Sequence, residues 1–253
     1  MTLTNFDRTR AAHRRLPLLP AQGPAGDFAR AALAGAVATL VLAAALTGWD
    51  GAFGAGLAAG MAVYAAAAFA AALEMHRRYP HPVVGLCNLV TLLRLVLAAS
   101  LVPALVAGTG PGWGLFAVAV VALSLDGADG WLARRQGLVS HFGARFDMEV
   151  DSLLGLILAT MAWTSGNAPA AVILLGLPRY VFGAAGLVLP WLRRDLPERF
   201  SRKAVCVVQL ATLIVLQLPI VPQGLSAGLV TLAAGALAWS FARDVIWLRQ
   251  ARA

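Results

Sequence analysis

The chain has 253 residues, of which 60% are hydrophobic and only 13% are charged. A soluble globular domain is roughly 45–50% apolar and about 25% charged, so this composition excludes an ordinary soluble domain, a disordered chain and a coiled coil. The mean hydropathy of +0.76 instead indicates an integral membrane protein. The two cysteines, Cys87 and Cys206, are too few for a disulfide scaffold, and both lie in or beside apolar runs, where we expect buried free thiols.

The formal net charge of the chain is +8. In a soluble protein such a charge would point to nucleic acid. Here the basic residues lie mainly between apolar runs, so membrane topology explains them better. We therefore expect no nucleic-acid partner.

The chain begins with a polar, basic segment, residues 1–28, which contains three prolines and is typical of a loose cytosolic tail. Eight apolar runs follow, each close to the roughly 20 residues that a helix needs to cross a membrane. They cover residues 29–48, 52–73, 86–107, 112–133, 144–164, 168–191, 203–221 and 224–246. In the second run, Gly56 and Gly60 have the spacing of closely packed membrane helices, although an alanine-rich helix also contains such spacings by chance.

Lysine and arginine are distributed unevenly over the loops between these runs. Alternate loops carry all of the loop Lys and Arg: the N-terminal tail, residues 74–82, 134–145 and 192–203, and the C-terminus. The turns near Asp50 and at 107–111, 164–168 and 219–223 carry none. Because basic loops stay in the cytosol, the pattern predicts eight spans with both termini cytosolic.

Four of the 12 acidic residues lie close together in the sequence, at the cytosolic ends of two consecutive spans: Asp126, Asp129, Asp147 and Asp151. The first two are three residues apart and the last two are four apart, so each pair shares one face of its helix. The loop 135–143 is short, so the two helices are expected to be antiparallel neighbours. The four carboxylates should then meet.

Four carboxylates near the apolar region repel one another, at several kcal/mol for each uncompensated ion, roughly speaking. Cations must offset that charge, and hard oxygen ligands suit Mg²⁺ or Mn²⁺, with room for two ions. The alternative is that the aspartates cap helix ends or pair with arginines. Glu149 lies on another face of its helix, where we expect a loop-end or partner-helix contact.

The four aspartates belong to a longer pattern, Asp126-x2-Asp129-Gly130-x2-Ala133-Arg134-x8-Gly143-x3-Asp147-x3-Asp151. This pattern resembles, without a gap or a substitution, the signature of the CDP-alcohol phosphatidyltransferases, which are membrane enzymes of phospholipid synthesis. A second element, Asn88-x2-Thr91-x2-Arg94, is similar to one at the start of that family's first core helix, although Cys87 stands where the family usually has proline.

The resemblance covers about residues 82–247 and implies an all-α fold, a polytopic transmembrane bundle with a six-helix core. It divides the chain into the tail 1–28, two additional helices with their connecting segment in 29–81, and a catalytic domain in 82–253. A homodimer is implied by the resemblance alone. Localisation is expected in a membrane, with the bacterial inner membrane the favoured one and the active site on the cytosolic side.

The resemblance also implies a reaction, in which an acceptor hydroxyl attacks the β-phosphorus of a CDP-alcohol, often CDP-diacylglycerol, and CMP leaves. By this likeness Asp126, Asp129 and Asp147 are metal ligands, and Asp151 is the general base and a further candidate ligand. The nucleotide site would be formed by Asn88, Thr91, Gly130, Ala133, Arg134, Ser140 and Gly143. For Ser140 and Thr91, local capping of the backbone is an equal alternative.

The acceptor is left open: glycerol 3-phosphate, inositol phosphate, serine, choline and a second lipid all fit, with a slight preference for an anionic one. Its candidate ligands are basic residues on or toward the same side: Arg145, Arg179, Arg202 and Lys203. Their alternative roles are orientation charge and contact with anionic lipids. Two other function classes compete with the enzyme: a transporter or channel that uses the acids as an ion site, and an inactive family member that acts as a scaffold.

Overall fold

A computed structural model describes residues 23–47, 53–193 and 200–250, and within these ranges all regular secondary structure is helical. The first half contains five helices and the second half the remainder, including two short 3₁₀ turns. The helices are α1 (Pro24–Thr47), α2 (Phe53–Arg78), α3 (Gly85–Ser100), α4 (Val102–Val106), α5 (Trp113–Gln136), α6 (His141–Thr164), η1 (Ala170–Val172), α7 (Ile173–Gly176), α8 (Pro178–Val188), η2 (Pro190–Arg193), α9 (Phe200–Val215) and α10 (Gln223–Gln250).

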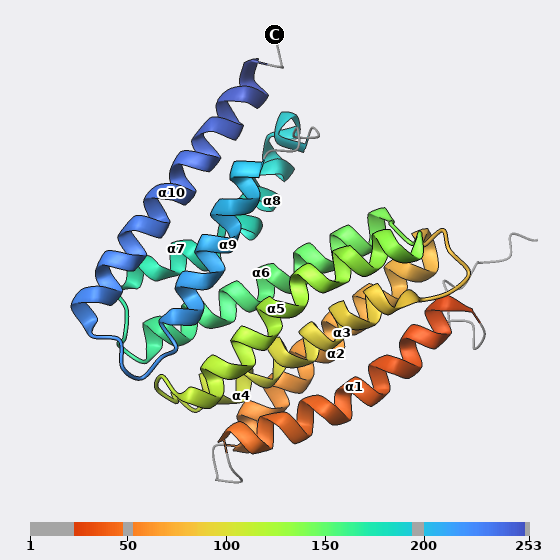
Figure 1. Cartoon of the computed structure of the whole chain (residues 1–253), viewed down its shortest axis with the longest axis horizontal. Helices are drawn as coiled ribbons and strands as arrows, with labels where there is room; N and C mark the ends of the chain where they lie inside the picture. Colours follow the sequence, from red (N-terminus) through yellow and green to blue (C-terminus); the bar gives the residue numbers. More distant parts are fainter. Residues whose placement is uncertain (1–22, 48–52, 194–199, 251–253) are drawn as a thin grey trace, which may run out of the picture.

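Helix α3 lies at the centre of the bundle and packs against α1, α2, α5 and α6 (Figure 1). Its short continuation α4 packs against α1, α2 and α6. Helices α9 and α10 pack against each other, and α9 also contacts α5 and α6 (Figure 1). The central helix therefore faces protein on most sides, which is why a polar side chain on it can be fully buried.

The predicted apolar runs overlap the helices, but the predicted count of eight spans is not confirmed. Helix α1 begins at Pro24, inside the segment 1–28 that was expected to be a loose tail, because Phe28 is buried in the apolar core that α1 and α2 form with α3 and α6. Among the described residues, five helices are long and apolar enough to cross a membrane, or six if the pair Ala170–Gly176 and Pro178–Val188, bent by 65°, forms one span. Helix α6 falls short because Asp147, Glu149 and Asp151 interrupt its apolar character, and in α9 only Ala204–Val215 is apolar. The chain is thus a multi-pass, all-helical membrane protein.

Two apolar cores hold the helices together. The larger one is formed by side chains from α3, α4, α5, α6, α7, α9 and α10, among them Leu158 and Leu213. The second joins α1 and α2 to α3 and α6. Within it, Phe28 meets Phe146 edge-on, with ring centroids 5.7 Å apart, and the Tyr64 hydroxyl donates a 2.8 Å hydrogen bond to the Ala32 carbonyl.

Gly56 and Gly60 of α2 allow a close approach to α3 and α4. A Cβ added at Gly56 would lie 2.9 Å from the Pro103 Cα, and one at Gly60 would lie 3.1 Å from the Ala99 carbonyl oxygen. The spacing seen in the sequence therefore does mark a tight helix contact. Gly54, two residues before Gly56, has nothing within 4 Å of the equivalent position.

We predict that Gly56→Ala lowers the free energy of unfolding by about 1–3 kcal/mol, because the added methyl group meets the backbone at Pro103, which cannot give way as a side chain can. Gly54→Ala is the matched control, and it should leave stability unchanged or raise it, since alanine favours a helix. Chemical unfolding in detergent micelles measures both. Equal stability of the two variants would contradict the close contact.

Candidate active site

The turn between α5 and α6 brings the two acidic helix ends to the same side of the bundle. Gly137 ends α5 in the left-handed conformation with φ of 67°, which glycine adopts without strain. Ser140 then caps α6, because its hydroxyl accepts a 3.0 Å hydrogen bond from the Gly143 amide. With both helices packed against α3, their aspartates face one another.

One carboxylate oxygen from each of Asp126, Asp129 and Asp147 lies within 4.8 Å of the other two. Asp129 is buried, whereas Asp126 and Asp147 are half-buried. Asp151 lies one turn further along α6 and is not a member of this group of three. The sequence-based prediction that the four residues approach one another agrees with this geometry.

A single arginine, Arg94 of α3, connects all four carboxylates. Its guanidinium is 1% exposed and forms ion pairs with Asp126 and Asp129, both at 3.0 Å, and with Asp147 and Asp151. Its Nε also donates to the Ala122 carbonyl at 3.2 Å. The sequence analysis placed Arg94 in a motif without giving it a role, yet a lone arginine inside an apolar span is itself a signal that acidic partners surround it.

Thr91 and Asn88 lie on the same helix as Arg94 and are both buried. The Thr91 hydroxyl oxygen lies 3.0 Å from Asp129 Oδ2 and 3.2 Å from the Cys87 carbonyl. Asn88 donates to the Val84 carbonyl at 2.6 Å and to the Tyr79 hydroxyl at 3.0 Å. Partial burial raises the pKa of Tyr79, which keeps that hydroxyl protonated. The Thr91 hydroxyl therefore helps to hold the Asp129 carboxylate in place. The hydrogen bonds of Asn88 hold the segment before α3 against the start of that helix.

The two glycines of the motif differ in their surroundings. A Cβ at Gly130 would meet only Arg134 Nη1, at 3.5 Å, whereas one at Gly143 would lie 3.3 Å from both Asn88 Oδ1 and Ser140 Oγ, so Gly143 allows a close approach of α6 to α3. Ala133 is half-buried and Arg134 is exposed. Ser140 performs the local capping that was its alternative role. None of these contacts tests a nucleotide-binding role, which stays a prediction.

The basic residues expected near the acceptor pair with different acidic side chains, and none of these pairs tests an acceptor-binding role. Arg145 pairs with Glu74 of α2 at 3.6 Å, and Arg179 pairs with Glu149. The expected partner-helix contact of Glu149 is thereby confirmed. Arg202 of α9 pairs with Asp244 of α10 at 2.9 Å. Lys203 follows Arg202 in α9, and its side chain lies outside the described residues.

Cys206 lies one turn from Arg202 on α9. The expectation of a buried free thiol is confirmed for Cys87 but wrong for Cys206, which is exposed. The physical reason is that the face of α9 that carries Cys206 and the exposed Val207 and Val208 is not covered by another helix within the described residues.

Residues 84–242, more than half of the chain, match the family model described as CDP-alcohol phosphatidyltransferase. The chain belongs to this family. It is also 33% identical over 147 residues, 54% of this chain and 68% of the relative, to proteins named probable phosphatidylglycerophosphate synthase from two strains of Mycobacterium tuberculosis, CDC 1551 / Oshkosh and ATCC 25618 / H37Rv. No solved structure matches the chain significantly.

Membership makes the protein a membrane-embedded transferase of phospholipid synthesis that uses a CDP-alcohol, which favours the enzyme over the transporter. The matched range contains Arg94 and all four aspartates, and helices α1 and α2 lie before it. The family generally depends on divalent metal. The donor set here fits such an ion, because hard carboxylate oxygens that lie within 4.8 Å of one another are the ligands that small divalent cations prefer.

We predict that Arg94→Gln lowers the free energy of unfolding by about 3–5 kcal/mol in the absence of divalent cations, because it leaves four carboxylates facing one another without their buried cation. Arg78→Gln is the control, since Arg78 is exposed and its pair with Glu74 is 3.4 Å long. Such a surface pair contributes about 0–1 kcal/mol. Chemical unfolding in detergent with a chelator present measures both, and equal losses would contradict a central role for Arg94.

Proposed function

We propose that the protein transfers the phosphatidyl group of CDP-diacylglycerol to a hydroxyl of an anionic acceptor, glycerol 3-phosphate, and releases CMP. The observation that carries this proposal is the convergence of four aspartates on one buried arginine within the family's matched range. The choice of acceptor is supported by the name of the relatives, because a phosphatidylglycerophosphate results when a phosphatidyl group joins glycerol phosphate.

Asp126, Asp129 and Asp147 are the residues that would hold the metal, as two Mg²⁺ or Mn²⁺ ions. Four carboxylates face one guanidinium, so the cluster keeps a net negative charge that Arg94 alone does not balance. A bound divalent ion would supply the charge that stabilises the phosphoryl oxygens and the departing CMP.

Asp151 is the residue we propose as the general base. It stands outside the group of three close oxygens, so it is not needed there as a ligand, and it shares the guanidinium of Arg94 with the other three aspartates. As the acceptor oxygen forms its bond to the β-phosphorus, Asp151 takes the hydroxyl proton, and the bond between that phosphorus and the CMP oxygen breaks. CMP carries away the bonding electrons as phosphate charge.

The nucleotide would lie along the small residues of the motif. Gly130 leaves room for close approach, Ala133 adds little bulk beside it, Gly143 brings the start of α6 close to Asn88, and the exposed fork of Arg134 can donate to the phosphates. Asn88 uses its amide hydrogens within the protein, which leaves its Oδ1, beside Gly143, as an acceptor for the base. Thr91 and Ser140 complete this proposed site.

For the acceptor, we keep the four basic residues Arg145, Arg179, Arg202 and Lys203 as candidates. Each of the first three already pairs with an acidic side chain, Glu74, Glu149 and Asp244 respectively, so an anionic acceptor would have to share or replace that pair. Arg145 lies on a different face of α6 from Asp147 and Asp151, which makes it the weaker candidate.

Three further proposals concern the whole chain: α1 and α2 are additions to a six-helix core, two copies form a homodimer, and both termini face the cytosol. The first is supported by the matched range, which begins at residue 84. The second rests on family likeness. The third is supported by the basic loops, and it places the active site where the charged substrates are, in the cytosol of a bacterium.

We predict that Asp151→Asn abolishes turnover and largely preserves nucleotide binding, because the amide keeps the shape of the side chain but cannot take a proton. The loss of a general base costs about 10²–10⁴-fold in rate. Asp126→Asn should weaken metal and nucleotide binding as well. CMP release from CDP-diacylglycerol with Mg²⁺ or Mn²⁺ and glycerol 3-phosphate measures turnover, and calorimetric titration with a CDP-alcohol measures binding.

Two results would contradict these roles. Identical binding losses in both variants would argue against separate functions for Asp126 and Asp151. Activity that continues unchanged in excess EDTA would argue against the metal. Replacing glycerol 3-phosphate with inositol phosphate or serine in the same assay tests the acceptor, and equal CMP release with each would remove the assignment.

We predict that a cysteine at Val139, in the α5–α6 turn, reacts with a membrane-impermeant maleimide in inside-out vesicles and not in intact cells. Val139 is 64% exposed and, unlike Ser140, caps no helix, so Val139→Cys leaves the fold intact. Cys87 and Cys206 are first changed to serine. Thr109→Cys, in the exposed turn on the opposite side, is the matched control with the reverse pattern. Labelling of Val139→Cys from outside would overturn the topology.

A further inference from the structure

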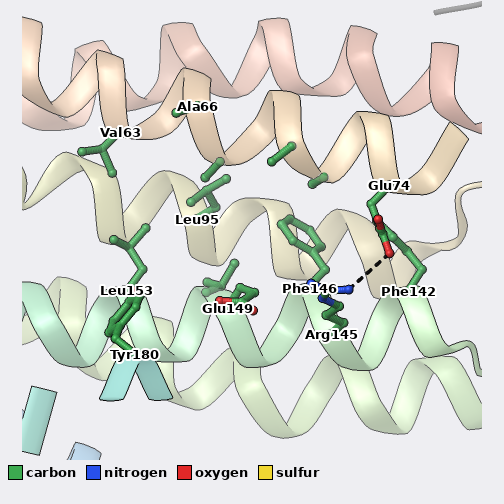
Figure 2. A pocket seen from close by; sticks show the side chains of 14 residues that line it. Val63, Ala66, Glu74, Leu95, Phe142, Arg145, Phe146, Glu149, Leu153 and Tyr180 are labelled. Atoms are coloured by element: carbon green, nitrogen blue, oxygen red, sulfur yellow. Dashed lines mark ion pairs between the residues drawn. The ribbon is translucent and has the colours of Figure 1, made fainter. Parts of the chain in front are cut away.

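A cavity of about 530 Å³ lies on the face of α6 that points away from Asp147 and Asp151. Its walls come from α2, α3, α6 and the first turn of α8 (Figure 2). Of the residues that line this cavity, only Arg145 is also a candidate for the proposed active site, and it pairs with Glu74. Since α2 forms one wall, the cavity depends on a helix outside the family's matched range.

The cavity is long and apolar over most of its length. Val63 marks one end and Glu74 the other, eleven positions apart on α2, which corresponds to about 16 Å of helix (Figure 2). That is roughly half of the 30 Å hydrocarbon core, the depth of one leaflet. Alanines of α2 and the side chains of Leu95 and Leu153 line this stretch, so it suits one acyl chain.

The end of the cavity at Glu74 is charged. Arg145 lies near Glu74 there, and Glu149 lies about midway along the cavity (Figure 2). Glu74 Oε1 is buried and has no hydrogen-bond partner among the described residues, although the guanidinium nitrogens of Arg78 and Arg145 lie 3.4 and 3.6 Å away. A buried acceptor without a hydrogen bond favours a ligand that brings an N–H group.

We propose that this cavity is a lipid site that holds one acyl chain of a membrane phospholipid with a primary-ammonium head group, of the phosphatidylethanolamine type. The ammonium donates to Glu74, and the phosphate pairs with Arg145. A quaternary ammonium has no N–H to donate to Glu74 Oε1, and an anionic head group without an amine has none either. The occupant is therefore a structural lipid distinct from the substrate, seated against the additional helix α2.

The test uses the purified full-length protein, stripped of lipid in detergent and examined by native mass spectrometry. Three probes with the same acyl chains are added: phosphatidylethanolamine, phosphatidylcholine and phosphatidylglycerol. A hydrogen bond to a charged group is worth about 1.5–3 kcal/mol, so phosphatidylethanolamine should bind about tenfold or more tightly than phosphatidylcholine. Equal retention of the two by the wild type would overturn the proposal.

Two pairs of variants separate the cavity from general lipid contact. Glu74→Gln should reduce the preference for phosphatidylethanolamine to near equality, whereas Glu149→Gln should reduce it less, because Glu149 already pairs with Arg179. Ala70→Trp fills the cavity and should abolish retention, and Ala65→Trp, exposed on α2 outside the cavity, should not. Equal retention by both tryptophan variants, or loss of dimers by Ala70→Trp with no lipid bound to the wild type, would show another occupant and overturn the proposal.

Discussion

The balance of charge around Arg94 is the constraint on which the rest of the structure depends. A guanidinium that is 1% exposed cannot remain in an apolar bundle without anionic partners, and four carboxylates cannot meet there without a cation. This mutual need holds α5 and α6 against α3, because the aspartates come from the first two helices and the arginine from the third. The central position of α3 is thus electrostatic as well as apolar in origin.

Helix α6 carries two different polar faces, and this explains its composition. Asp147 and Asp151 face Arg94, whereas Arg145 and Glu149 face Glu74 and Arg179 on other elements. The acids make α6 too polar to satisfy a simple span criterion, yet its later turns, around Leu158 and Met161, are fully buried in the larger core. One helix can therefore serve a catalytic centre and a separate cavity, because its faces meet different neighbours.

Helices α1 and α2, which precede the matched range, pack closely against the helices of the core. Gly56 and Gly60 bring α2 against Pro103 and Ala99, and the second apolar core joins α1 and α2 to α3 and α6. Where the helices diverge toward their charged ends, the packing leaves the cavity with Glu74 at its end. The added pair thereby changes the surface of the bundle without touching the aspartate cluster.

The sequence by itself determined the all-helical membrane class, the positions of the helices and the identity of the four aspartates. These properties are local, since apolar runs, loop charges and residues three or four apart act within one segment. Tertiary structure alone decided that Arg94 joins the carboxylates, that Arg145 meets Glu74, that Cys206 is exposed and that the segment 168–191 bends by 65°. The periodicity of a helix says which residues share a face, but only packing decides which helix that face meets.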